Sequence, residues 1–154
     1  MSFTISKESP LGADLALLMA RHTADMHADT PPESIHMMDA GQLAVPQVAF
    51  FVLREAGVAQ AMGAFKRLSG SHAEIKSMHV LAEARGRGLS KAMLDHLILE
   101  ARAAGVTQLS LETGVQPTFV AARALYTKAG FTECPPFEGY VEDPNSVFMT
   151  RSLA

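Results

Sequence analysis

The chain has 154 residues, of which 48% are hydrophobic, so residues 1–154 can bury the core of a single domain without disulfides. Its 13 Lys and Arg against 16 Asp and Glu give a net charge of −3, which argues against nucleic acid as a partner. The first residues, MSFTISKESPLG, lack the pattern of a secretory signal, and no apolar stretch could span a bilayer, so we expect a cytoplasmic protein without a membrane partner.

The first third of the chain predicts one strand and two helices. Phe3 to Ile5 suits a short strand, and apolar residues then recur at helical spacing from Leu11 to Met26. The run Thr30-Pro31-Pro32 breaks this pattern. We expect Glu33 to Gln42 to form a second short helix or a turn.

Three strands are predicted in the middle of the chain. Gln47–Glu55 and Val58–Leu68 are apolar, β-leaning runs joined around Gly57, which indicates a hairpin. His72–Val80 continues as the next strand. From Leu89 onward the period changes, and a helical apolar stripe runs as far as Gly105, a natural helix end.

The remaining elements alternate between strand and helix. Val106–Thr113 suits a strand, Phe119–Ala129 a helix, and Phe131–Glu133 and Val147–Leu153 two final strands. The whole order is β-α-α-β-β-β-α-β-α-β-β. It predicts a mixed α/β domain with a strand–loop–helix unit at the middle of the sheet.

That central loop, Arg85-Gly86-Arg87-Gly88-Leu89-Ser90, has the features of a phosphate site. A glycine-rich turn at a helix start leaves backbone N–H groups unpaired, and the helix dipole adds positive charge there. Arg85, Arg87 and Lys91 add three cations. The alternative is a tight turn with solvated basic residues. The loop matches neither a Walker A motif nor a Rossmann fingerprint, because Lys91 stands where a third glycine would be needed.

The loop resembles the motif [RQ]-x-x-G-x-[GA] of the GNAT acetyltransferases, with Ser90 departing at the last place. Residues 121–131, AARALYTKAGF, resemble the later A-x-x-L-Y-x-K-x-G-F helix of that family. Strings near residues 32–36, 74–78, 111–114 and 143–149 further resemble its YsnE-like bacterial group. The resemblance implies a mostly antiparallel central sheet flanked by helices.

Acetyl-CoA (coenzyme A) is the cofactor that this resemblance implies. The strand before the loop would carry the acetylated arm, with backbone groups of Met78 and Val80 offered to it. Phe119 stands where many relatives place an asparagine. The implied cofactor-binding residues are Met78, His79, Val80, Arg85, Gly86, Arg87, Gly88, Leu89, Ser90, Lys91, Phe119, Ala122 and Tyr126.

Two residues are the candidates for catalysis. Tyr126 lies in the second motif and keeps its proton at neutral pH, so we expect it to be the acid that protonates the departing thiolate. Glu74 corresponds to the catalytic glutamate of the histone-acetyltransferase branch, although a water relay or a purely structural glutamate is the alternative. His79 ranks lower, because strand alternation turns it away from the face of Glu74, Met78 and Val80.

The acceptor is expected to enter across the sheet from the loop. The candidate acceptor-binding residues are Glu33, His36, Asp39, Glu112, Tyr140 and Asn145. The alternative is that residues 36–39 cap a short helix and that residues 143–145 form a turn. No motif indicates a metal site.

The resemblance implies an N-acetyltransferase that moves an acetyl group directly to a primary amine of a small molecule or peptide. The alternative is an acyl-CoA-binding sensor or regulatory module that has kept the loop but lost turnover. Both a monomer and a homodimer are compatible with the sequence.

Overall fold

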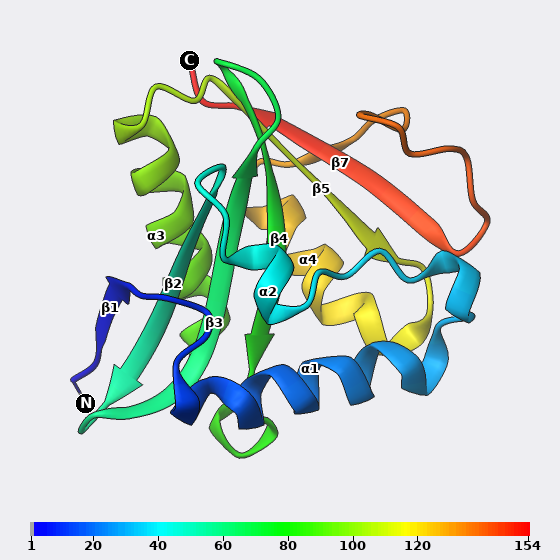
Figure 1. Ribbon diagram of the computed structural model, residues 1–154. Coiled ribbons are helices and arrows are strands. Elements are labelled where there is room, and N and C mark those ends of the chain that lie inside the picture. Colours follow the sequence, from blue (N-terminus) through cyan, green and yellow to red (C-terminus); the bar gives the residue numbers. More distant parts are fainter. Residues whose placement is uncertain (1) are drawn as a thin grey trace.

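Residues 2–154 are described by a computed structural model, in which helices cover both faces of a seven-stranded sheet (Figure 1). The strands are β1 (Thr4–Lys7), β2 (Val48–Glu55), β3 (Val58–Arg67), β4 (His72–Val80), β5 (Gln108–Gly114), β6 (Thr132–Glu133) and β7 (Ser146–Ser152). The α-helices are α1 (Ala16–Asp29), α2 (Ala40–Leu43), α3 (Leu89–Ala103) and α4 (Val120–Lys128). Short 3-10 turns are η1 (Ala13–Leu15), η2 (Pro32–Ser34), η3 (Ala82–Ala84) and η4 (Pro117–Phe119).

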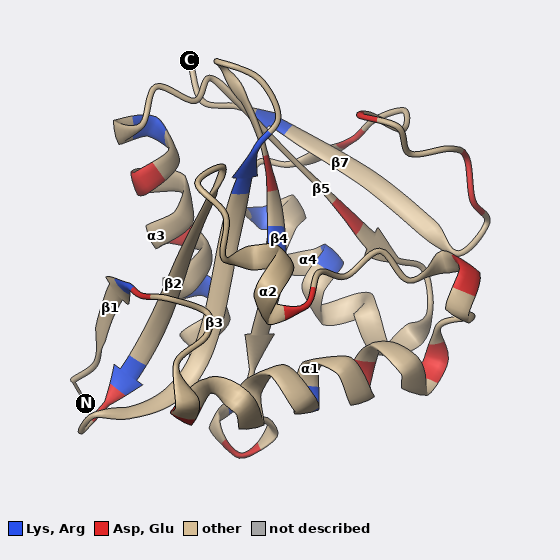
Figure 2. Cartoon of the chain, in the orientation of Figure 1, with Lys and Arg blue, Asp and Glu red and all other residues tan. Residues whose placement is uncertain are grey.

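Charged residues occur on helices, strands and loops rather than along one face (Figure 2). None of the helices formed by residues 2–154 is both long and apolar enough to cross a membrane.

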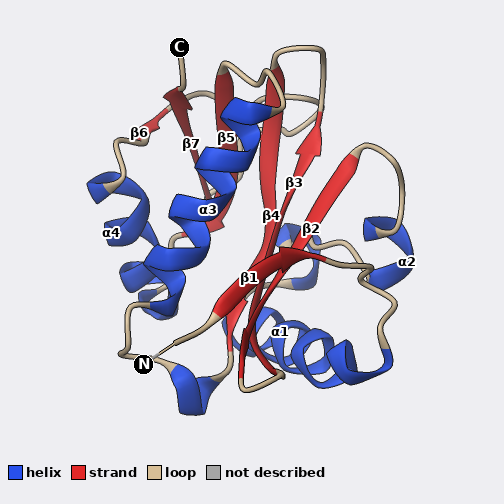
Figure 3. Cartoon of the chain, turned by 90° about the vertical axis from the view of Figure 1, so that its left-hand side faces the viewer, coloured by secondary structure: helices blue, strands red, loops and turns tan. Residues whose placement is uncertain are grey.

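The strand order is β1-β2-β3-β4-β5-β7-β6, and every neighbouring pair is antiparallel except β4 and β5. Helices α1 and α2 cover one face and α3 and α4 the other (Figure 3). The apolar stripe of α3 is buried, including Met93, Leu94 and Leu97. The predicted mixed, mostly antiparallel sheet with flanking helices is therefore confirmed.

The segment before β2 differs from its prediction. Instead of the single short helix or turn expected over residues 33–42, the chain forms the turn η2, an extended stretch and the four-residue helix α2. The Asp39 side chain accepts a hydrogen bond from the Gln42 N–H at 2.7 Å, and the Gln42 side chain accepts one from the Asp39 N–H at 2.9 Å. This capping box starts α2 at Ala40, so the preceding residues stay extended.

Strand β4 contains a bulge that alters which way its side chains point. In its pairing with β3, Met62 lies opposite His79 but Ala64 opposite Lys76, so Ser77 and Met78 together oppose Gly63. Ser77 has a φ of 57°, in the left-handed region that non-glycine residues rarely adopt. The extra residue shifts the alternation of the strand by one position.

Strands β4 and β5 pair only through His72, Ala73 and Glu74, opposite Gln108, Leu109 and Ser110. Beyond these residues the two strands separate. β4 continues along β3 as far as Val80, and β5 continues along β7 as far as Gly114. The sheet therefore opens between two strands that are each held by their outer neighbour.

Replacing Ser77 with glycine tests the backbone strain at the bulge. We expect Ser77→Gly to raise the free energy of unfolding by about 1 kcal/mol, because glycine adopts a positive φ without steric cost. Urea denaturation gives the measurement. The control is Ser152→Gly on β7, where φ is not positive and the change should cost roughly 0.5–1 kcal/mol. If both substitutions destabilise the protein equally, the backbone at Ser77 is not strained.

Candidate active site

The loop between β4 and α3 is shaped by two left-handed glycines. Gly86 has a φ of 81°, and Gly88, the residue before α3, has a φ of 78°. A Cβ at either position would meet no atom within 4 Å, so the backbone conformation rather than crowding requires glycine. The first N–H groups of α3 have no partner inside the helix, and such groups at a helix start are suited to contact an anion.

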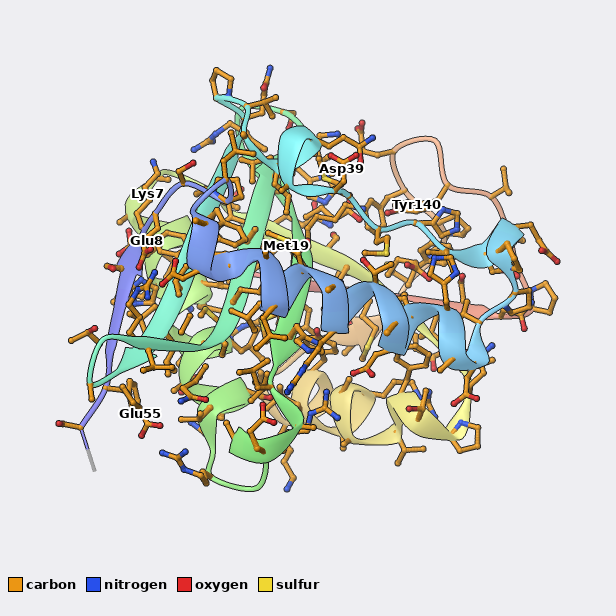
Figure 4. All side chains as sticks on the ribbon, turned by 60° about the horizontal axis from the view of Figure 1, so that its bottom comes forward. Lys7, Glu8, Met19, Asp39, Glu55 and Tyr140 are labelled. Carbon is orange, nitrogen blue, oxygen red and sulfur yellow. The ribbon has the colours of Figure 1, made fainter. Side chains whose placement is uncertain are left out.

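A pocket of about 470 Å³ lies against this loop, and we call it the loop pocket. Its walls come from the end of β4, residues 84–91, α1 and the start of α4. Every residue that the sequence predicted to bind the cofactor lines it except Arg87. Arg87 forms an ion pair with Glu55, which the β2–β3 hairpin brings to the loop (Figure 4).

Helix α1 contributes a wall that the sequence analysis missed. His22, Asp25 and Met26 line the loop pocket. Asp25 accepts a hydrogen bond of 2.8 Å from Arg85, whose Nε also donates to the Val80 carbonyl at 3.0 Å. No local pattern marks these α1 residues, because only the crossing of α1 over the sheet brings them here.

The expected orientation of His79 is wrong. The bulge turns His79 toward α1, where its ring lies 5.3 Å from that of His22, on the face that Glu74 also occupies. Met78 instead approaches Met93 of α3 on the other face. Burial lowers the pKa of His79, and burial together with His79 lowers the pKa of His22 to about 4.

A second, smaller pocket of about 120 Å³ lies where β4 and β5 separate, and we call it the splay pocket. The residues shared by the two pockets are His22, Met26, Met78, Phe119, Ala122 and Tyr126. The two spaces therefore meet at one junction, which connects the two faces of the sheet.

Tyr126 stands at this junction. Its side chain is buried, and its ring packs against Phe131 with 5.9 Å between centroids. Burial and, to a smaller extent, Glu112 raise its pKa to about 12. The phenol thus keeps its proton at neutral pH and can act as a proton donor.

Two carboxylates line the splay pocket, but they differ in their partners. Glu112 forms no ion pair within residues 2–154, and burial raises its pKa, an effect opposed by the nearby Ser146 hydroxyl. Glu74 accepts a hydrogen bond of 2.6 Å from the Tyr140 hydroxyl and lies 3.3 Å from the Lys76 ammonium. Glu112 is therefore the carboxylate that is better suited to accept a proton.

The six residues predicted to bind the acceptor are only partly brought together. His36 and Glu112 line the splay pocket, and the rings of Tyr140 and His36 are perpendicular, with 5.0 Å between their centroids. Asn145 donates to Ser34 Oγ at 3.3 Å. Glu33 and Asp39 line neither pocket, and Asp39 instead caps α2. Within residues 2–154, no cluster of three or more His, Cys, Asp or Glu side chains could hold a metal ion.

Comparison with known proteins agrees with this architecture. The sequence model of the Acetyltransferase (GNAT) family matches residues 17–131. The chain is 42% identical to the uncharacterised N-acetyltransferase YsnE of Bacillus subtilis, over 92% of this chain and 94% of that protein.

Solved structures agree as well. A Klebsiella pneumoniae protein assigned as an acyl-CoA N-acyltransferase superimposes with a TM-score of 0.81 and 29% identity, over 99% of this chain and 98% of that one. The fold also matches yncA of Salmonella typhimurium, solved with its cofactor acetyl-CoA, with a TM-score of 0.72 and 20% identity over 100% and 95% of the two chains. With a family match across most of its length and a full-length relative of this similarity, the chain belongs to the GNAT acetyltransferase family.

Proposed function

We propose that this acetyl-CoA-dependent acyltransferase moves the acetyl group directly to a primary amine that enters through the splay pocket. The observation that carries the proposal is the junction of the two pockets. A proton donor, Tyr126, lines both pockets there, and a carboxylate of raised pKa, Glu112, lines one of them.

Several features of the loop pocket favour acetyl-CoA as its ligand. Gly86 and Gly88 leave open space above the backbone, and the first turn of α3 offers N–H groups to a pyrophosphate. Arg85 and Lys91 supply positive charge at its edge. Met78 and Val80, at the separated end of β4, would hold the pantetheine arm. When bound, acetyl-CoA supplies the acetyl thioester.

We assign complementary tasks to Glu112 of the splay pocket and Tyr126 of the junction. An amine attacks only as the free base, so Glu112 would take the proton from the entering ammonium. Tyr126 would hold a proton at its hydroxyl for the leaving sulfur. Glu74, the base expected from the resemblance, lines the same pocket, but its carboxylate already accepts a hydrogen bond from Tyr140. We propose it as the support of the site and as the second candidate for the base.

A sensor without turnover is the competing function, and Ser90 and Phe119 are the departures from the family pattern that favour it. Both residues line the loop pocket, so both functions require acetyl-CoA to bind. The half-buried Glu112, which no ion pair within residues 2–154 neutralises, favours turnover, because a binding module has no use for a base in the splay pocket.

Binding of acetyl-CoA should stabilise the protein. At a concentration 100 times Kd the free energy of unfolding should rise by about 2.7 kcal/mol, which is roughly 5–10 °C in Tm for a chain of this size. Thermal denaturation and calorimetry give the measurement. Gly88→Glu should abolish the shift, because it places a carboxylate in the anion site. The matched control is Gly105→Glu, at the other end of α3, where φ is also positive and space is open. If the wild-type protein shows no binding at millimolar concentrations of acetyl-CoA, the proposal is wrong.

Tyr126→Phe should lower kcat by about 10²-fold or more, because it removes the proton donor and leaves the ring in place. The affinity for acetyl-CoA, measured by calorimetry, should stay unchanged. Turnover is measured as coenzyme A release with a verified amine. An unchanged kcat would show that Tyr126 has only a structural role.

Glu112→Gln should lower the activity of the protein but raise its stability above the folded pKa of Glu112. Wild-type kcat/KM should rise as the pH increases through the raised Glu112 pKa, because the base must be ionised. In the variant this acid limb of the pH profile should be absent, and kcat/KM should be lower by about 10²-fold. Because the folded pKa lies above the ordinary 4.5, wild-type stability should fall as pH rises from 4.5 through the folded pKa. The variant should lack this loss in urea denaturation across the same range.

The control for this experiment is Glu74→Gln, which should retain the acid limb of the pH profile. If the limb instead disappears in Glu74→Gln and persists in Glu112→Gln, Glu74 is the base.

A further inference from the structure

We propose that the acceptor is a small primary amine with a short aliphatic body, and that two chain segments form a fixed roof that keeps peptides out. The roof consists of residues 34–37, which cross the opening between β4 and β5, and residues 137–145 of the loop before β7 (Figure 1). This inference rests on the proposed function and adds the substrate class to it.

The first fastening of the roof joins its two segments directly. Ser34 is buried, and its hydroxyl donates to Asp143 Oδ2 at 2.7 Å. Asn145 Nδ2 donates to the same Ser34 oxygen at 3.3 Å, and the Asn145 N–H donates to Asp143 Oδ1 at 2.8 Å. These bonds to the Asn145 backbone and to Ser34 lower the pKa of Asp143, so its carboxylate is ionised at neutral pH and the bonds are charge-assisted.

The second fastening ties both segments to β4. The Lys76 ammonium donates to the His36 carbonyl at 2.9 Å and to the Tyr140 hydroxyl at 3.0 Å. The Tyr140 hydroxyl in turn donates to Glu74 at 2.6 Å. Because Lys76 and Glu74 are largely buried, solvent screens this network less than a surface ion pair. The roof therefore has anchors both between its segments and on the strand below.

His36 and Met37 are the roof residues that line the splay pocket, and the space they leave is small. At about 120 Å³ the splay pocket is well below the roughly 300–1,000 Å³ of pockets that take drug-sized ligands. Met37, Ile75 and Leu111 give it apolar walls. Among its charged groups, Lys76 is paired with Glu74, which leaves Glu112 as the carboxylate without an ion pair within residues 2–154. Ser77 also lines the pocket, and its buried hydroxyl has no hydrogen-bond partner within residues 2–154.

This combination selects the acceptor by size and by charge. An ammonium can approach Glu112 and give an N–H to the Ser77 oxygen, while a few methylene groups contact the apolar walls. A peptide α-amine carries a substituted backbone on its adjacent carbon and needs an open groove to pass the roof. Opening the roof should therefore widen the range of acceptors without altering acetyl-CoA binding.

The test measures coenzyme A release with ethylamine, butylamine, hexylamine and a tetrapeptide that has a free α-amino group. For the wild type we expect kcat/KM with the best alkylamine to exceed that with the tetrapeptide at least 100-fold. Asp143→Ala, which removes the first fastening, should raise the tetrapeptide-to-butylamine ratio at least tenfold. The control Glu142→Ala removes an adjacent exposed carboxylate and should leave the ratio unchanged.

If Asp143→Ala does not fold, Tyr140→Phe loosens the second fastening while keeping the ring, and the same rise in the ratio is expected. A wild type that acetylates the tetrapeptide as readily as the alkylamines would overturn the small-amine inference and leave the proposed function intact. Unchanged ratios in the folded variants would overturn the roof. Acetyl-CoA binding without transfer to any amine would overturn the proposed function, and this inference with it.

Discussion

The separation of β4 from β5 is the constraint on which the rest of the site depends. After Glu74 and Ser110 the two parallel strands no longer pair, while the antiparallel ladders to β3 and β7 continue on their outer sides. The inner edges of both strands are thereby left with backbone groups that need partners from elsewhere. A ligand can supply such partners, and the opening also joins the loop pocket to the splay pocket through the sheet.

The bulge at Ser77 decides which side chains reach this opening. By shifting the alternation of β4, it directs His79 to α1 and leaves Met78 toward α3. The site also contains ionisable groups whose pKa is raised so that the neutral form is favoured, among them the half-buried Glu112 and the buried Tyr126. Such burial lowers stability unless it is compensated, and local strain with shifted pKa values is a common property of sites that carry chemistry.

In the loop between β4 and α3, the backbone and the charged side chains have different roles. Its cations pair with acids from other parts of the chain: Arg85 with Asp25, Arg87 with Glu55 and Lys91 with Asp95. Exposed pairs of this kind contribute little to stability, but they hold the long side chains near the loop. The proposed affinity of the loop for an anion therefore depends mainly on the N–H groups at the start of α3 and on the left-handed glycines.

The sequence by itself determined the features that depend on local chemistry. The Gly86 and Gly88 turn and the α3 stripe could be predicted, because neighbouring residues carry the signals for turns and helices. The family resemblance further indicated a set of residues that the structure places around the loop pocket, with the exception of Arg87. Only the tertiary structure decided the rest. Long-range packing produces the α1 wall, the ion pair between Arg87 and Glu55 and the different partners of Glu74 and Glu112. The bulge in β4, one inserted strand residue, reverses the orientation of His79. These features cannot be predicted from neighbouring residues, because they depend on contacts between segments that are distant in the sequence or on a local change of strand register.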